Sequence, residues 1–334
     1  MKVDCGIDFD LEKAGARAIE LEESGYSALL SAEMSHDPFF PLLLAAQNTN
    51  KIELMTSIAV AFARSPMNLA HIGHDLNAYS KGRFILGLGS QIKPHIVKRF
   101  SMPWSSPAAR MREFILAMRA IWSTWHQGKP LDFSGDFYTH TLMTPFFTPT
   151  DCDYGPPKVF LAAVGPRMTE VAGEVADGMI VHAFTTETYL RETTLPSLKK
   201  GFEKAGKNRD DFEISYPLFV CTGQTEEELE ASIKTTAQQI AFYGSTPTYK
   251  PVLDSIGAGD LQIELNKMSK QGQWAEMGNL VGPDLIKHFA VIGEPSTIAS
   301  QIKERYGDLI DRSCAAYANI PKSEQMKIVR ELAR

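Results

Sequence analysis

The sequence has few cysteines, and none of them stand close together. Its four cysteines, Cys5, Cys152, Cys221 and Cys314, are widely spaced and form no C-x-x-C pair. This spacing argues against a zinc knuckle and against a redox dithiol. Isolated thiols of this kind fit a reducing compartment, so we expect a cytoplasmic protein with reduced cysteines.

Long basic or apolar runs are also absent. The net charge is -6 and no basic tract occurs, which argues against nucleic acid as a partner. No apolar run is long enough to cross a bilayer, and the first residues read as a strand instead of a signal peptide. We therefore expect neither a membrane nor a nucleic-acid partner.

The 334 residues contain a regular alternation of apolar strand patterns and amphipathic helix patterns. Strands are expected at Lys2–Asp8, Ser27–Ala32, Ile52–Val60, Arg83–Leu88, Lys158–Ala163, Gly178–His182, Glu213–Val220 and Asp311–Tyr317. Helices are expected at Asp10–Ser24, Pro38–Asn48, Pro66–Ser80, Pro107–Trp125, Pro166–Ala176, Glu187–Ala205, Thr225–Phe242 and Lys322–Arg334. Eight strand–helix pairs favour an α/β fold of the (β/α)8 TIM-barrel type over an open sheet.

Two stretches interrupt this alternation. Residues 127–157 follow the fourth helix and are rich in Phe, Thr, Pro and Asp, and residues 243–307 precede the last strand. Insertions in a barrel often cover the active face or build a contact between subunits. We expect one barrel domain over residues 1–334 with these two insertions.

The segment Ile52–Gln91 reads as a complete β-α-β unit. A buried strand leads to Ser65-Pro66, a suitable helix start, because Ser caps the free N–H groups and Pro fits the first turn. The helix ends at Lys81-Gly82, and the next strand ends in Gly-Leu-Gly-Ser. Both strand ends lie on the side of the fold where α/β proteins collect their chemistry.

A second unit, Val159–His182, leads from a strand into Gly165-Pro166, which opens a helix. Free N–H groups and the positive dipole end at a helix start attract anions. Gly165 allows close approach and Arg167 adds charge. An ordinary strand–helix turn with no ligand is an equally good interpretation of this unit.

The segments RSPMNLAHIGHDLNAYSKGRFILGLGSQ (residues 64–91), LAAVGPRMTEVAGEVADGMIVH (residues 161–182) and AFYGSTPTYKPVL (residues 241–253) carry a resemblance to a known family. The chain resembles the luciferase-like monooxygenase superfamily, and more closely its coenzyme F420-dependent oxidoreductase branch. AFYGSTP and GQWAEMG indicate a narrower, uncharacterised subfamily.

The resemblance implies a barrel that binds a flavin-like ring at the carboxyl ends of its strands. A bulge after the third strand, with a cis peptide best matched by Ser57–Ile58, would support the ring together with Val60. Gly89, Ser90 and Gln91 would flank its edge or tail. The cofactor phosphate would bind at a segment made of Ala163, Val164, Gly165, Pro166 and Arg167.

Glu33 and His36 follow the second strand, where this superfamily often places an acidic or histidine group near the reacting ring atom. Either one is a candidate proton donor or acceptor. Sugar-phosphate dehydrogenases of the superfamily have a glutamate after the Gly-x-Gly of the fourth strand, whereas this chain has Ile92 at the best match. That departure argues against the same sugar-phosphate chemistry.

The leading functional hypothesis is hydride transfer between F420 and an unidentified small organic substrate. The alternatives are an FMN-dependent two-component monooxygenase, which would need a separate reductase, and a non-catalytic flavin-binding protein. Lys93, Lys98 and Arg99 could meet the anionic tail of F420, although a solvated helix face is the simpler interpretation. The resemblance also suggests a homodimer or higher homo-oligomer.

Two histidine patterns have less specific interpretations. His71 and His74 share a helix at a spacing that can bind metal, but no third ligand is placed by spacing, so no metal site is expected. His182 ends the sixth strand, where it either lines the pocket or is a satisfied buried histidine.

Overall fold

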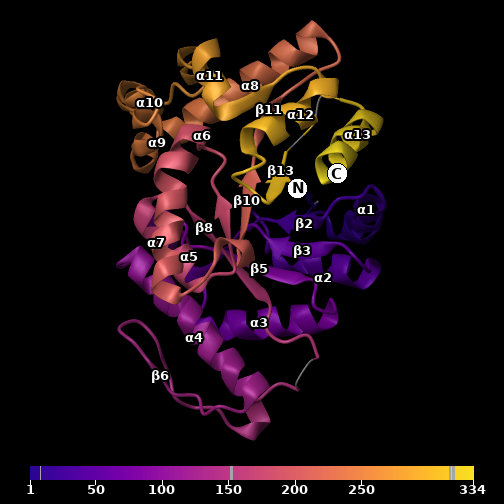
Figure 1. Ribbon diagram of the computed structural model, residues 1–334. Coiled ribbons are helices and arrows are strands. Elements are labelled where there is room, and N and C mark those ends of the chain that lie inside the picture. The colour runs from indigo at the N-terminus through magenta and orange to yellow at the C-terminus, as the bar shows by residue number, and fades with distance from the viewer. Residues whose placement is uncertain (8, 151–152, 316, 318–319) are drawn as a thin grey trace.

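The computed structural model describes residues 1–7, 9–150, 153–315, 317 and 320–334. Its main sheet consists of parallel strands with helices between them (Figure 1). The eight barrel strands are β1 (Lys2–Gly6), β2 (Ala28–Ser31), β3 (Glu53–Thr56), β5 (Phe84–Gly89), β8 (Lys158–Ala163), β9 (Gly178–Val181), β10 (Glu213–Pro217) and β13 (Arg312–Cys314). Strand β3 pairs with β5, and β1 pairs with β13, so the sheet closes on itself. The predicted (β/α)8 barrel is confirmed.

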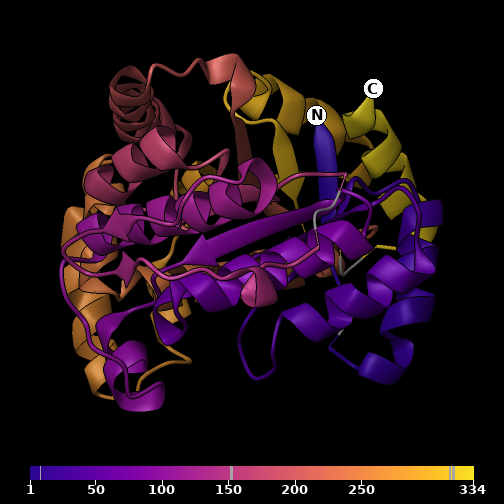
Figure 2. The same ribbon diagram turned by 90° about the horizontal axis from the view of Figure 1, so that it is seen from below.

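Helices surround the barrel (Figure 1), and the view from below shows helices on either side of a long strand (Figure 2). They are α1 (Leu11–Glu23), α2 (Phe39–Asn48), α3 (Pro66–Tyr79), α4 (Pro107–Gln127), α5 (Pro166–Val175), α7 (Leu195–Ala205), α12 (Pro295–Tyr306) and α13 (Lys322–Ala333). A short helix, α6 (Glu187–Tyr189), and a π-helical turn lead into α7. Helix α3 begins as predicted, because the Ser65 hydroxyl accepts a hydrogen bond from the Asn68 N–H at 3.2 Å and Pro66 occupies the first turn.

A second group of elements forms a lobe beside the barrel. It contains α8 (Glu226–Gly244), α9 (Lys250–Asp254), α10 (Gly259–Lys270), α11 (Pro283–Phe289) and the strand pair β11 (Phe219–Cys221) and β12 (Ala290–Ile292). Because β11 follows β10 directly, the lobe begins at the carboxyl end of a barrel strand. Its buried apolar residues, among them Ile240, Leu265 and Phe289, form a cluster separate from the main core.

The helix predicted at Thr225–Phe242 is therefore present but lies in this lobe. Ile298 and Ile302 of α12 instead join the main core of the barrel. The seventh barrel helix is α12, and not the helix predicted at Thr225–Phe242. The apolar face of a helix can be predicted from the sequence, but the element against which that face packs cannot.

The first insertion forms a small hairpin of β6 (Phe133–Ser134) and β7 (Thr139–His140), which lies alongside α4 (Figure 1). Glu113 of α4 holds its turn by accepting hydrogen bonds from the N–H groups of Asp136, Phe137 and Tyr138 at 2.6 to 2.9 Å. Cys152, in the same insertion, lies outside the described residues, as do Asp8 and Ala316 of the predicted first and last strands.

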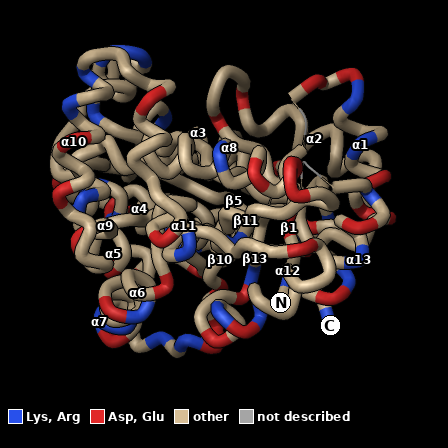
Figure 3. Tube along the Cα trace, turned by 90° about the horizontal axis from the view of Figure 1, so that it is seen from above, with Lys and Arg blue, Asp and Glu red and all other residues tan. Residues whose placement is uncertain are grey.

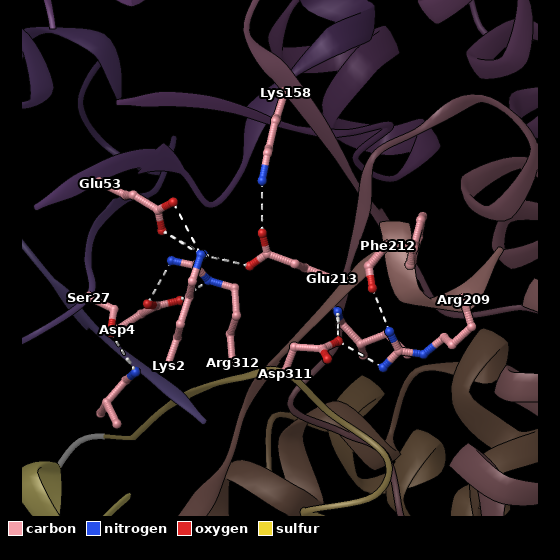
Figure 4. Close-up of polar contacts among 12 residues, drawn as sticks. Lys2, Asp4, Ser27, Glu53, Lys158, Arg209, Phe212, Glu213, Asp311 and Arg312 are labelled. Atoms are coloured by element: carbon pink, nitrogen blue, oxygen red, sulfur yellow. Dashed lines mark hydrogen bonds and ion pairs between the residues drawn. The ribbon is translucent and has the colours of Figure 1, made fainter. Parts of the chain in front are cut away.

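The amino end of the barrel is closed by charged side chains (Figure 4). Lys2, Glu53, Lys158 and Glu213 are the first residues of alternate barrel strands. Lys2 Nζ lies 3.2 Å from Glu53 and 3.1 Å from Glu213, and Lys158 Nζ lies 3.0 Å from Glu213. Four side chains from alternate strands form one layer of a TIM-barrel interior, and here that layer alternates in charge.

Arg312 of β13 lies beneath this layer with no exposed side-chain surface. Its guanidinium donates two hydrogen bonds to Asp4, at 2.8 and 2.9 Å, and further bonds to Glu53 and Glu213 at 2.7 and 2.9 Å. A buried cation is tolerated only with such partners. The four charged side chains of this layer, together with Arg312 and Asp4, close the amino end of the barrel, and we call them the ionic plug.

Charges of both signs are interspersed over the outside of the molecule (Figure 3). Within the described residues, no helix combines the length and the apolar character needed to cross a membrane. The described cysteines Cys5, Cys221 and Cys314 are free thiols.

Candidate active site

The strand predicted at Ile52–Val60 is interrupted at the carboxyl end of β3. A short strand, β4 (Ala59–Val60), follows the break and pairs with Leu88 and Gly89 of β5. The Ser57–Ile58 peptide between β3 and β4 is cis, as the family resemblance implies. The Ser57 N–H donates to the Ser31 carbonyl at 2.7 Å, so the break is tied to the end of β2.

Glu33, from the loop after β2, holds the other side of this break. Its Oε2 accepts hydrogen bonds from the Val60 N–H at 2.7 Å and from Arg64 at 2.6 Å. The Glu33 N–H donates to the Ile58 carbonyl at 3.0 Å. The carboxylate is 7% exposed, and charge-assisted bonds of this kind are among the strongest in proteins. These contacts make Glu33 part of the framework of the β3–β4 segment.

Ile58 and Gly89 meet at the carboxyl end of the barrel. A Cβ atom added to Gly89 would lie 2.8 Å from Ile58 Cδ1, so the glycine makes room for the isoleucine side chain. Gly87, two residues earlier, has the Thr56 carbonyl at 1.8 Å from such a Cβ position. The structure thus brings together two of the predicted ring-contacting residues, Ile58 and Gly89.

The loop after β5 has a left-handed residue near its start. Gln91 has a positive φ of 57°, and its side-chain oxygen accepts the Ile92 N–H at 3.0 Å. The Ser90 hydroxyl donates to the Gln91 carbonyl at 3.1 Å. Arg99 donates a hydrogen bond to the Met34 carbonyl, which ties this loop to the loop after β2. Arg99 thus joins the two loops. Its contact with the anionic tail of F420 stays a prediction.

The predicted phosphate segment lies at the junction of β8 and α5. Gly165 is the N-cap of α5 and makes no side-chain capping bond. Apart from its two chain neighbours, no residue has an atom within 4 Å of an added Cβ, and Pro166 and Arg167 are also exposed. A ten-residue helix that begins this way offers N–H groups and a positive dipole end to an anion.

His36 lies on the surface near the same end of the barrel. Its ring stacks on Phe9, with ring centroids 5.8 Å apart and an angle of 30° between the planes. The residue is exposed to solvent. The roles of Glu33 and His36 in proton transfer stay predictions.

Two further residues come together at this end of the barrel. His182, directly after β9, and Tyr249, from the turn Pro247–Tyr249, are joined by a contact of 3.2 Å between Nε2 and Oη. The sequence placed His182 at a strand end, but nothing in its spacing pointed to Tyr249. The only available signal was the segment AFYGSTPTYKP, which contains that tyrosine.

The histidines of α3 make protein contacts. His74 Nε2 lies 3.2 Å from the Thr150 carbonyl oxygen, and the His71 ring lies 4.6 Å from the Trp125 ring. Burial is the main cause that lowers the pKa of His74, and the contact with Thr150 opposes it. Within the part of the chain that the structure describes, no three His, Cys, Asp or Glu residues are grouped to hold a metal.

Comparison with known proteins identifies the family of this chain. The family model for luciferase-like monooxygenase matches residues 4–312. An uncharacterised protein of Mycobacterium tuberculosis is 51% identical over 93% of this chain and 92% of its own. The F420-dependent glucose-6-phosphate dehydrogenase of Mycolicibacterium gilvum is 28% identical over 62% of this chain and 63% of its own.

Among solved structures, the coenzyme F420 dependent tetrahydromethanopterin reductase from Methanopyrus kandleri superposes with a TM-score of 0.78. It is 20% identical, and the match covers 100% of this chain and 98% of that one. This likeness supports the fold, and the family model spans most of the sequence. The chain belongs to the luciferase-like monooxygenase family.

Proposed function

We propose that this protein is an F420-dependent oxidoreductase that transfers hydride between the deazaflavin and a small organic substrate. The observation that carries the proposal is the relationship to proteins named as F420-dependent. One is 28% identical over 62% of this chain, and another shares the barrel over the whole chain. When bound, the deazaflavin ring supplies the hydride donor or acceptor. The protein binds, orients and shields it.

The residues at the carboxyl end of the barrel fit such a group. Ile58 contacts both Glu33 and Gly89, and its apolar side chain would support the ring together with Ser57 and Val60. The uncapped start of α5 at Gly165 suits a phosphate. Exposed Arg167 would add a positive charge there. The backbone of Ala163, Val164 and Pro166 would form the rest of the phosphate site.

The contacts of Glu33 and His36 suggest different roles for these two candidate acid–base residues. The Glu33 carboxylate is paired with Arg64 and with the Val60 N–H, so its contribution is to fix the shape of the β3–β4 segment. His36 is exposed and near the same loop, so it is the better candidate to exchange a proton with a bound substrate.

An FMN-dependent monooxygenase is the second candidate, because the matching family model is itself named for monooxygenases. Such an enzyme would depend on a separate reductase for reduced FMN. The two candidates differ in their need for oxygen, since a monooxygenase consumes it and hydride transfer from reduced F420 does not.

The test is to follow the oxidation of reduced F420 by absorbance in the presence of a panel of small carbonyl compounds. The proposal predicts oxidation that requires both protein and an organic substrate and that continues without oxygen. Turnover with reduced FMN that stops when oxygen is removed, together with no reaction of F420, would favour the monooxygenase.

A further inference from the structure

His182 and Tyr249 form a polar pair between the barrel and the lobe. His182 directly follows β9, and Tyr249 ends a short turn after α8. Their rings lie 4.7 Å apart at an angle of 31°, and Tyr249 Oη lies 3.2 Å from His182 Nε2. Sixty-seven positions of sequence separate them, so the pair exists only because the lobe packs against the end of β9.

A backbone N–H group determines which ring nitrogen of His182 carries the hydrogen. The Phe184 N–H donates a hydrogen bond to His182 Nδ1 at 3.0 Å, so Nδ1 must carry a lone pair. The neutral ring then has its hydrogen on Nε2, where it can only donate to Tyr249 Oη. Burial also favours the neutral ring, because it lowers the pKa of His182 to about 4.

Because Tyr249 Oη accepts this bond, its own hydrogen must be directed elsewhere. His182 is the single hydrogen-bond partner of that hydroxyl among the residues that the structure describes. Burial, with a smaller contribution from Tyr243, raises the pKa of Tyr249 to about 12. The phenol therefore stays protonated at neutral pH and offers one hydrogen to an external acceptor.

The residues around His182 and Tyr249 favour a neutral acceptor for the Tyr249 hydroxyl hydrogen over an anion. His182 lines a small recess with Ala163 and Val164 of the predicted phosphate segment. Phe184 also lines this recess and its ring packs against Tyr249, whereas the Tyr243 ring packs against His182, so both neighbouring rings are uncharged. An anion placed among these rings would lose hydration, whereas a neutral oxygen needs only one donor.

We propose that Tyr249 donates its hydroxyl hydrogen to a carbonyl oxygen of the molecule bound at the mouth of the barrel, with His182 as the positioning residue that orients the hydroxyl. This inference rests on the proposed function and deepens it. Carbonyl groups occur both in the cofactor ring and in small organic substrates of hydride transfer, so the experiment must separate these two sources.

The experiment compares wild-type protein with Tyr249→Phe by fluorescence and absorbance titration. The first arm uses F420 alone, and the second adds cyclohexanone to protein saturated with F420. If the acceptor belongs to the ring, Y249F binds F420 about fivefold to tenfold more weakly, the loss expected for one hydrogen bond. If it belongs to the substrate, F420 binding is unchanged and the spectral response to cyclohexanone weakens by a similar factor.

A variant that matches wild type in both arms overturns the inference. Failure of the proposed function looks different, because wild-type protein itself would then not bind F420. In that case the first arm is repeated with FMN, whose ring also has carbonyl groups, and an unchanged FMN affinity in Y249F again overturns the inference.

Matched variants separate the hydroxyl from the packing. Tyr243→Phe removes a neighbouring hydroxyl from the same ring cluster and is expected to bind as wild type does. His182→Gln keeps an N–H donor and should retain most of the affinity, whereas His182→Leu should lose as much as Y249F. Melting curves establish that each variant is folded.

Nitrogen-15 spectra of wild-type protein labelled at histidine give an independent test that needs no variant to fold. The inference requires His182 to remain the neutral tautomer with hydrogen on Nε2 between pH 8 and about 5. A ring that carries hydrogen on Nδ1, or that becomes charged near pH 6.5, would overturn it.

Discussion

Arg64 and Glu33 form an ion pair of 2.6 Å beneath the β3–β4 segment, and the same carboxylate oxygen accepts the Val60 N–H. Glu33→Ala removes both bonds and leaves Arg64 with Asp37 as its remaining acidic partner. We expect this variant to lower the free energy of unfolding by about 2–3 kcal/mol and to weaken cofactor binding. Chemical denaturation and cofactor titration measure the two effects.

Glu33→Gln is the matched control for the role of this residue. Glutamine keeps an oxygen that can accept the Val60 N–H but cannot transfer a proton as a carboxylate does. If Glu33 only positions the segment, E33Q retains most of the cofactor affinity and of the turnover. An E33Q protein that binds the cofactor normally but has no turnover would show that Glu33 takes part in the chemistry.

Gly165 provides a test of the phosphate segment that leaves the fold intact. Its φ of -83° suits any residue and an added Cβ meets no atom within 4 Å, so Gly165→Ala should not lower the melting temperature. A methyl group at the start of α5 would obstruct an anion there. We expect cofactor affinity to fall about tenfold, measured by fluorescence titration.

Gly282 offers a control of the same kind. It is also an N-cap followed by proline, with a φ of -72° and open space around the added Cβ, but it begins α11 in the lobe. Gly282→Ala is expected to leave both melting temperature and cofactor affinity unchanged. Equal affinities for G165A and wild type would refute the assignment of the phosphate to this helix start.

The ionic plug at the amino end of the barrel should be essential for stability. Arg312→Met leaves the buried Asp4 carboxylate without its two hydrogen bonds, and an unpaired buried charge typically costs about 3–5 kcal/mol. Arg17→Met is the control, since Arg17 forms a surface pair with Glu20 and should cost less than about 1 kcal/mol. Denaturation midpoints that fall equally in the two variants would contradict this account of the plug.

The same plug predicts a loss of stability in acid. Burial by itself would raise the pKa of Glu213, but hydrogen bonds from Arg312 and Lys158 and the nearby positive charges outweigh it and lower the pKa to about 2. The folded protein therefore holds this carboxylate ionised below its unfolded pKa of 4.5. Its stabilising contribution is complete above about pH 4.5 and is lost as the pH falls toward 2.

Glu213→Gln should therefore flatten the dependence of the melting temperature on pH between about 4.5 and 2. The variant will also be less stable at neutral pH, because it loses its ionic partners. A wild-type and a variant curve that run parallel through this range would show that Glu213 does not titrate as described.

The sequence allowed the barrel and its helix starts to be predicted because these depend on local patterns. Ser65-Pro66 and Gly165-Pro166 both open helices as expected, and the family resemblance located the cis peptide after Ser57. Local patterns report whether a segment is apolar, capped or turning, and each of these features is contained within a few residues.

Contacts between distant segments were not predictable in the same way. The bond from Arg312 to Asp4 spans 308 positions, and the Tyr249–His182 contact joins the lobe to the barrel. Strand periodicity shows that a residue faces inward, but not which charge it meets across the barrel. For the same reason, α8 could be recognised as a helix although its place in the lobe could not.

Fluorescence titration of the purified protein with F420, and in parallel with FMN, tests the central claim most directly. The account predicts saturable binding of one F420 per chain, weakened in Gly165→Ala and not in Gly282→Ala. Saturable binding of FMN with no binding of F420 would contradict it.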